Sequence, residues 1–324
     1  MALFSLRTMT PSPFAATLVV STFLMGSSFI ASKYLLRDGY PSTLLVGWRF
    51  IAAALAALPL VLLDGGRFRD ALLPSGTTRR HVALVVLIGV IQTTGVMGLL
   101  FLSLRSIPAS TAAIILSSNP IWVALLGRVF MGEQLPYLRV LGLVVGLAGV
   151  ACAIGIGPDL FANPVALAGE GVALASALCW AVSTMLAKHA VLPLGPWAMS
   201  FWQMLVGACV LLVIGYCVGE QWPSHTNAAQ WGMFLWLAIP ASTGSFGLWF
   251  LALRQGGATR ASSYLFLPPL FAIILSFFLL DAPITWMQLA GGGLVGLAIW
   301  LIGRSGPQRE TPAVRAQVLA EGEP

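Results

Sequence analysis

Charged residues are scarce in this sequence, and their scarcity limits the solvent in which the chain can fold. Of its 324 residues, 9% are charged and 58% are hydrophobic, whereas soluble domains carry about 25% charged residues. Such a chain could not cover a water-exposed surface, so a lipid bilayer is the environment that suits it. The net charge of +6 does not indicate nucleic-acid binding, because the basic residues are scattered over short loops and no nucleic-acid-binding module is present.

Several kinds of chemistry are also missing. The four cysteines lie in apolar stretches without a CxxC pair or a histidine at ligand spacing, which predicts neither a disulfide nor a metal site. The sequence contains no GxxxxGK[ST], HExxH or GxSxG motif. None of its eleven acidic residues falls in the middle of a predicted span, as a proton-coupled carrier or an aspartate-based membrane enzyme would require. We therefore expect no cofactor and no enzymatic activity, with an intramembrane enzyme as the less favoured alternative.

The sequence does contain ten apolar runs, most of them close to the roughly 20 residues that cross a bilayer. They form a single predicted transmembrane domain over residues 1–303, and the polar tail 304–324 is predicted to be cytoplasmic and disordered. The first run is long enough to span and is interpreted as a helix rather than a cleaved signal. The predicted spans are 13–36, 42–63, 81–104, 108–130, 137–156, 167–189, 198–219, 230–254, 259–280 and 286–303.

The basic residues give the predicted orientation. With the N-terminus in the cytoplasm, thirteen lysines and arginines fall inside and three fall outside, as the positive-inside rule requires. The loops 157–166, 220–229 and 281–285 carry no lysine or arginine and all lie on the outer side. We expect a multi-pass protein of the cell inner membrane with both termini in the cytoplasm.

An internal repeat relates the two halves of the chain. At an offset of 149, Thr93-Thr94-Gly95-x-x-Gly98 pairs with Ser242-Thr243-Gly244-x-x-Gly247, and a looser match pairs Trp48 with Trp202. Repeat 1 covers 13–156 and repeat 2 covers 167–303. Because each repeat has five spans, an odd number, the second must be inverted relative to the first. Inverted repeats indicate a secondary transporter with its substrate site near the midplane.

The segment Phe101-Leu102-x-Leu104-Arg105 leads into a helix that contains Pro120, Gly132-Glu133 precedes the fifth span, and the fifth and tenth spans are rich in glycine. In these features the chain resembles the drug/metabolite transporter superfamily, in its ten-helix EamA-type branch, and within that branch it is most similar to bacterial amino-acid exporters. The second repeat departs from the pattern with Asp281-Ala282. The resemblance implies an all-α fold in which spans 1–4 and 6–9 surround a central cavity and spans 5 and 10 support it from outside.

Polar and aromatic residues in the spans are the candidate substrate contacts. Polar groups in the bilayer core cost free energy unless they are satisfied, so they either line the cavity or bond to a neighbouring helix. Tryptophan and methionine suit an adaptable lining for amphipathic solutes, although each could instead face lipid. The predicted substrate-binding residues are Met25, Ser28, Trp48, Gln92, Thr93, Asn119, Trp180, Trp202, Ser242, Ser245, Trp249 and Tyr264.

Two prolines and one arginine complete the predicted site. Pro120 and Pro269 occupy equivalent places in the repeats, and we interpret them as kinks that gate the path or as static packing kinks. Arg49 lies about seven residues inside the second span. Two roles are open for it: its guanidinium could bind a carboxylate, or its side chain could extend to the outer surface.

These features predict a secondary transporter that exports small neutral or amphipathic metabolites by alternating access, without an obligatory proton step. The resemblance favours amino acids, including aromatic or hydrophobic ones, and a drug or multidrug efflux carrier of the same fold is the alternative. The expected partners are a small-molecule substrate and the bilayer, with no nucleic acid. Oligomeric state is open, and a monomer is compatible with the sequence.

Overall fold

The structure is a computed structural model that describes residues 11–62, 68–131, 136–154, 163–190, 192–256, 263–281 and 284–304. Within these ranges all regular structure is helical. The elements are α1 (Pro11–Arg37), α2 (Ser42–Val61), α3 (Phe68–Leu72), α4 (Arg79–Gly89), η2 (Val90–Gly98), α5 (Leu99–Ser103), α6 (Ala109–Leu116), α7 (Asn119–Met131), α8 (Tyr137–Ile154), α9 (Pro164–His189), α10 (Pro196–Cys217), α11 (Ala228–Ala238), η4 (Ile239–Gly244), α12 (Ser245–Gly256), η5 (Ser263–Phe266), α14 (Leu267–Leu280) and α15 (Trp286–Arg304).

The helices agree with the predicted spans, each of which contains helical residues. Six helical stretches in the described part are long and apolar enough to cross a membrane. Shorter apolar helices lie at Tyr137–Gly149, Leu267–Leu279 and Trp286–Ile302. The chain is therefore an all-helical, multi-pass membrane protein, and the count of ten crossings stays a prediction. Gly132-Glu133 and residues 305–324 of the predicted tail lie outside the described residues.

Two of the predicted spans contain a π-helical segment at their centre. One segment begins at Val90 and the other at Ile239, which are 149 positions apart, the offset of the sequence repeat. π-Helical turns are rare and occur often at functional sites. The wider turn therefore appears at the same point of both repeats, where the sequence predicted substrate contacts.

The two predicted proline kinks have a different form in the structure. The helix before Pro120 ends at Leu116 and a new helix begins at Asn119. Likewise, the 3-10 turn η5 ends at Phe266 before α14 begins. Pro120 and Pro269 thus lie in the first turns of new helices, where a missing N–H costs little. The irregularity predicted at each proline thus takes the form of an interruption just before it, and a gating role for the two prolines stays a prediction.

The packing of the helices repeats itself in the two halves. α1 packs against α14 and α12, whereas α9 packs against α7 and α5. α2 contacts η4 and α11, and its counterpart α10 contacts η2 and α4. The remaining large interfaces, α2 with α10 and α8 with α15, join elements that the repeat makes equivalent. This pattern is compatible with two inverted repeats related by a pseudo-twofold axis.

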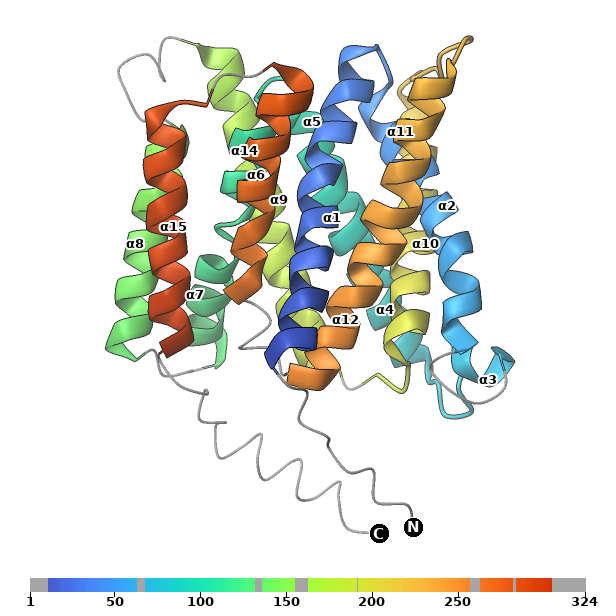
Figure 1. The fold of residues 1–324 in the computed structure, drawn as a ribbon. Coiled ribbons are helices and arrows are strands. Elements are labelled where there is room, and N and C mark those ends of the chain that lie inside the picture. Colours follow the sequence, from blue (N-terminus) through green and yellow to red (C-terminus); the bar gives the residue numbers. More distant parts are fainter. Residues whose placement is uncertain are drawn as a thin grey trace.

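α8 and α15 form a separate pair at one edge of the bundle (Figure 1). They approach closely because small residues face each other. A Cβ added at Gly149 would lie 2.9 Å from the carbonyl oxygen of Gly291, and one at Gly142 would lie 2.9 Å from that of Ala298. The first residues of α1 and the last of α15 lie at the same end of the bundle (Figure 1).

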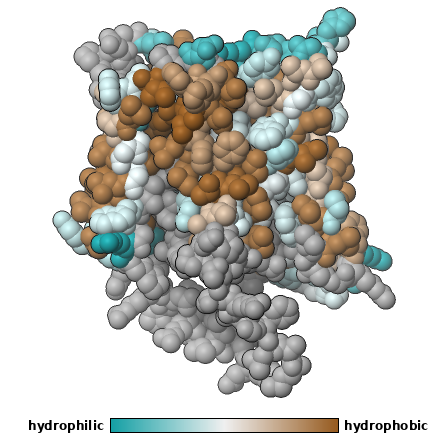
Figure 2. All heavy atoms as spheres, in the orientation of Figure 1, coloured by the Kyte–Doolittle hydropathy of each residue, from teal (hydrophilic) through white to brown (hydrophobic). Residues whose placement is uncertain are grey.

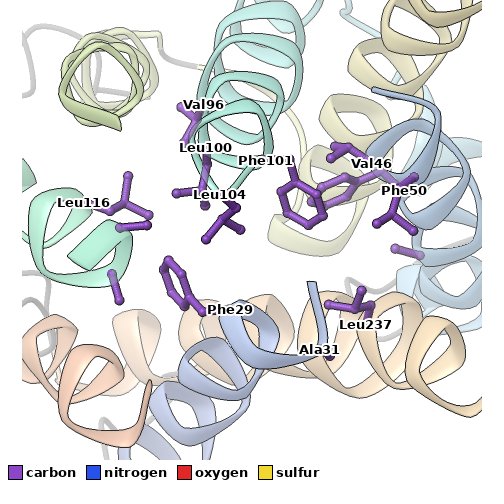
Figure 3. Packing of buried hydrophobic residues seen from close by; sticks show 14 of the residues in the cluster. Phe29, Ala31, Val46, Phe50, Val96, Leu100, Phe101, Leu104, Leu116 and Leu237 are labelled. Atoms are coloured by element: carbon purple, nitrogen blue, oxygen red, sulfur yellow. The ribbon is translucent and has the colours of Figure 1, made fainter. Parts of the chain in front are cut away.

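The middle of the bundle has apolar side chains both outside and inside. Apolar residues cover much of the face in Figure 2, and hydrophilic residues gather along its upper rim. Exposed apolar side chains such as Phe130, Val144 and Phe278 suit contact with lipid tails. Inside, a continuous apolar core joins helices of both repeats, and Figure 3 shows part of it around Phe29, Phe50 and Phe101.

Candidate functional site

A small central cavity lies where helices of both repeats meet. Its volume is about 50 Å³. That is room for a few water molecules, far below the ~300–1,000 Å³ of typical ligand pockets. The space is therefore too small to hold an amino acid in this structure. The lining residues are Met25, Ser28, Phe29, Arg49, Met97, Leu100, Ala113, Leu116, Ser117, Trp180, Ala241, Ser245, Phe246, Leu265 and Pro268.

Two pairs of the lining residues are related by the repeat. Met97 pairs with Phe246, and Leu116 pairs with Leu265, each at the offset of 149. In each pair one residue comes from the first half and the other from the second. Figure 3 shows Phe29 of α1, Leu100 of α5 and Leu116 of α6 around the same space. The cavity is therefore a shared interface between the halves, mostly apolar and with a few polar groups.

Arg49 is the only charged residue among the cavity-lining residues of the described chain, and it is 2% exposed. Its Nε donates to Ser242 Oγ at 2.8 Å and to the carbonyl oxygen of Leu237 at 3.3 Å. The guanidinium carbon lies 4.8 Å from the ring centroid of Phe50 and 5.4 Å from that of Phe101. These contacts connect α2 to the second repeat. They also hold the side chain inside the protein, so extension to the outer surface does not occur in this structure.

Serines complete the polar part of the cavity wall. Ser28 Oγ donates to the carbonyl oxygen of Met25 at 2.7 Å, and Ser245 Oγ donates to that of Ala241 at 2.7 Å. Both hydroxyl protons are thus used within their own helices, and their oxygens retain lone pairs that can accept a hydrogen bond. Ser242 does not line the cavity but supports Arg49.

The threonines next to the cavity connect helices in a symmetrical way. Thr94 Oγ1 donates to the carbonyl oxygen of Gly207 at 3.0 Å, and its repeat partner Thr243 donates to that of Ala53 at 2.8 Å. Positions 53 and 207 differ by 154, the same offset as Trp48 and Trp202. Thr93 Oγ1 in turn donates to the carbonyl oxygen of Gln203 at 3.0 Å. Thr93 therefore bonds to a neighbouring helix, which is the alternative that the sequence left open for it.

Gln92 lies next to the central cavity but not in it. Its side chain faces a tight space that also contacts Gln203, and the space shares Met97 and Phe246 with the central cavity. Gln92 and Gln203 are 7% and 6% exposed. The two buried amides extend the polar character of the site toward η2 and α10.

Four of the predicted aromatic contacts do not line the central cavity in this structure, and a role for them in substrate binding stays a prediction. Trp48 is 38% exposed and donates to the Tyr216 hydroxyl at 3.3 Å, on the outside of the bundle. Trp202 donates to the carbonyl oxygen of Leu72 at 2.9 Å. Trp249 and Tyr264 pack on a separate cluster near Phe14. The helices carry apolar residues all round, so their sequences do not show which face points inward.

Asn119 and the prolines lie at the edge of the cavity. Asn119 is buried, and its Nδ2 donates to the carbonyl oxygen of Ala177 on α9 at 3.4 Å. Pro268 lines the cavity, next to Pro269, for which the sequence predicted a gating role. Met25, Ser28, Trp180 and Ser245 are thus the predicted substrate contacts that the structure brings together, with Arg49 beside them.

Sequence reasoning missed Phe29 and Phe246, which both line the cavity. The repeat contained a signal for Phe246, because its partner at the offset of 149 is Met97. No comparable signal marked Phe29, which is one apolar residue among many in the first span.

Two larger hollows, of about 490 and 480 Å³, open on the outside of the bundle. Exposed residues such as Leu55 and Trp231 line the first of them, so these hollows suit lipid rather than a polar substrate.

Comparison with known proteins defines the class of the molecule. Residues 13–155 and 167–304 each match the EamA-like transporter family, and the two matched segments lie close to the two predicted repeats. The fold is also similar to that of a solved crystal structure, with a TM-score of 0.66 over 89% of this chain and 96% of the other at 19% identity. The molecule is a multi-pass membrane transporter. The chain belongs to the EamA-like transporter family.

Individual relatives agree with this class. The uncharacterized transporter YyaM of Bacillus subtilis is 24% identical over 85% of this chain and 88% of its own. The uncharacterized inner membrane transporter YedA of Escherichia coli K12 is 23% identical over 82% of each chain. A WAT1-related chloroplastic protein of Arabidopsis thaliana is 26% identical over 88% of this chain and 68% of its own. The family and these names indicate a transporter rather than an enzyme.

Proposed function

We propose that the protein is a secondary carrier that exports small neutral or amphipathic metabolites, with amino acids as the first candidates. One observation supports this proposal: the central cavity lies between the two halves and is lined by residues of both, two pairs of which are related by the repeat. A site shared in this way can be exposed to either side of the membrane when the halves exchange conformations. The mixed lining, with Trp180, Phe29 and Met25 beside serines and Arg49, suits amphipathic solutes.

Alternating access requires the cavity to open, and irregular segments of the helices are the proposed points of movement. With a volume of about 50 Å³ the cavity must expand before an amino acid fits. The π-helical segments η2 and η4 and the interruptions before Pro120 and Pro269 all lie next to it. At these points the regular i to i+4 hydrogen bonding of the α-helix is already interrupted. We propose that the halves rearrange around them, with Pro120 and Pro269 at the hinges.

The proposed architecture has ten crossings as two inverted five-helix repeats, with both termini in the cytoplasm. The inner membrane is the proposed location in the cell, which agrees with the positive-inside asymmetry of the sequence. We propose transport down the substrate gradient without an obligatory proton step, because the sequence places no carboxylate in the middle of a span.

Counterflow in proteoliposomes tests the proposed function. The purified protein is reconstituted, loaded with an unlabelled neutral amino acid and diluted into the same labelled compound, with protein-free vesicles as the control. A carrier accumulates label transiently because exchange is faster than net flux. Chemically altered label would indicate an enzyme, and label that enters without stimulation by the loaded compound would indicate a channel.

The same vesicles distinguish the remaining alternatives. Lipophilic drugs in place of amino acids test the multidrug efflux carrier, and counterflow of these drugs without counterflow of any amino acid would contradict the amino-acid proposal. An imposed proton gradient tests the energy source. Strict dependence of flux on that gradient would contradict gradient-driven transport of the substrate alone.

A further inference from the structure

The Arg49 guanidinium has donors that the protein does not use. Only its Nε donates to described residues, to Ser242 and to Leu237. The two Nη nitrogens make no hydrogen bond within the described ranges, and no ion pair to Arg49 is present there. Ser42 Oγ is the one fully enclosed polar side-chain atom without a partner in that part of the chain. The Nη nitrogens are therefore not fully enclosed by protein, and Arg49 is one of the residues that line the central cavity.

A buried charge without a counter-charge is unfavourable, and this one is placed to gain from an anion. Arg49 is 2% exposed, so water contributes little to its solvation. The rings of Phe50 and Phe101 stabilise the cation through their faces, but they supply no acceptor for the Nη protons. A guanidinium fits a planar carboxylate through two parallel hydrogen bonds. A carboxylate is thus the ligand that both the charge and the donor geometry select.

We propose that Arg49 binds the carboxylate of the substrate, so that the protein carries small organic carboxylates, amino acids with apolar side chains among them. This inference rests on the proposed function, since it concerns the same cavity. It also gives the substrate an orientation. The carboxylate lies at Arg49, between α2 and η4, and the apolar part of the substrate contacts Phe29, Leu100 and Trp180. A cationic drug would be repelled by the same guanidinium.

The repeat provides an internal comparison for this assignment. At the offset of 154 that relates Trp48 to Trp202, Arg49 corresponds to Gln203. The second repeat thus carries a neutral amide of similar reach at the equivalent point, and Gln203 is itself buried. The substitution Arg49→Gln gives the first repeat the side chain that the second already accommodates. It removes the charge while retaining a hydrogen-bond donor near Ser242.

Binding is measured on the purified full-length chain in detergent, as the rise of the thermal unfolding midpoint with ligand concentration. The probes are propionate, isovalerate and 3-phenylpropionate, each with its uncharged amide of the same shape, and the amino acids alanine, leucine and phenylalanine. We expect carboxylates to stabilise the wild-type protein and their amides to bind at least tenfold more weakly. Arg49→Gln is expected to weaken carboxylate binding roughly 10- to 100-fold. The matched control Arg105→Gln removes an exposed arginine and leaves binding unchanged.

Arg49→Lys separates charge from shape. A lysine keeps the positive charge but lacks the planar fork, so its affinity for carboxylates is expected to lie between those of the wild type and Arg49→Gln. If Arg49→Gln does not fold, Arg49→Lys and the comparison of acids with amides on the wild type still decide the question. The assignment is overturned if no probe acid stabilises the wild type, if each amide binds as well as its acid, or if Arg49→Gln binds acids with unchanged affinity.

The same probes in proteoliposome counterflow separate this inference from the proposed function. Carboxylate binding that depends on Arg49 without counterflow of any probe would support the role of Arg49 and contradict the carrier. Counterflow of the amides but not of the acids would support the carrier and overturn the role of Arg49.

Discussion

Replacing Gly207 by alanine tests the close contact between α10 and η2 beside the cavity. A Cβ at this position would lie 2.3 Å from Thr93 Cβ and 2.5 Å from the carbonyl oxygen of Gly89. Neither atom belongs to the flexible end of a side chain. The two helices would have to separate by about 1 Å to restore ordinary van der Waals contact. That movement would also stretch the hydrogen bonds from Thr93 to Gln203 and from Thr94 to Gly207, both 3.0 Å long.

The expected cost follows from these contacts. Overpacking of a well-packed interior costs about 1–3 kcal/mol, and hydrogen bonds between membrane helices contribute about 0.6 kcal/mol each on average. We therefore expect Gly207→Ala to reduce the free energy of unfolding by about 2–4 kcal/mol. Alanine gains up to about 1 kcal/mol in helix propensity over glycine, so the net loss measured is about 1–4 kcal/mol.

The assay is unfolding of the purified protein in mixed micelles, followed by tryptophan fluorescence as the denaturing detergent increases. Gly296→Ala is the matched control, because a Cβ there would meet no atom within 4 Å. Gly296→Ala has the same propensity gain and is expected to be neutral or slightly stabilising. Equal stability of the two variants would refute the close approach of α10 and η2.

Two further predictions concern the support of Arg49 and the topology. Ser242→Ala removes the shorter of the two hydrogen bonds of Arg49 Nε. In the same unfolding assay it is expected to lower the free energy of unfolding by about 1–3 kcal/mol. Stability equal to that of the wild type would contradict the role of this bond. In a variant without native cysteines, an impermeant thiol reagent is expected to reach His225→Cys in intact cells and Ser75→Cys only after permeabilisation, and the reverse pattern would contradict the orientation.

The sequence predicted the helices well because a bilayer imposes long apolar runs. The offset of 149 in the sequence also relates the first residues of the two π-helical segments, since η2 and η4 begin at Val90 and Ile239. A pattern shared by two halves of one chain reflects their common backbone geometry. It therefore carried more structural information than any single residue did.

The inner faces of the helices could not be predicted in the same way. Trp48 and Trp180 both lie within apolar spans, yet Trp48 faces outward and Trp180 lines the cavity. In water a polar face would mark the outside of a helix, but in lipid both faces are apolar. The surroundings of Arg49 were also hidden, because Ser242 lies 193 positions away and only the packing of the two repeats brings it near.

The accessibility of Ser28→Cys in the cavity tests the central claim most directly. In a variant without native cysteines, a small impermeant thiol reagent is added to right-side-out or to inside-out vesicles, with counterflow substrate as the competitor. If two inverted halves expose one shared cavity alternately, the thiol reacts from each side in turn, and substrate slows the reaction from both. Reaction from one side only, or the same rate with and without a transported substrate, would contradict the account.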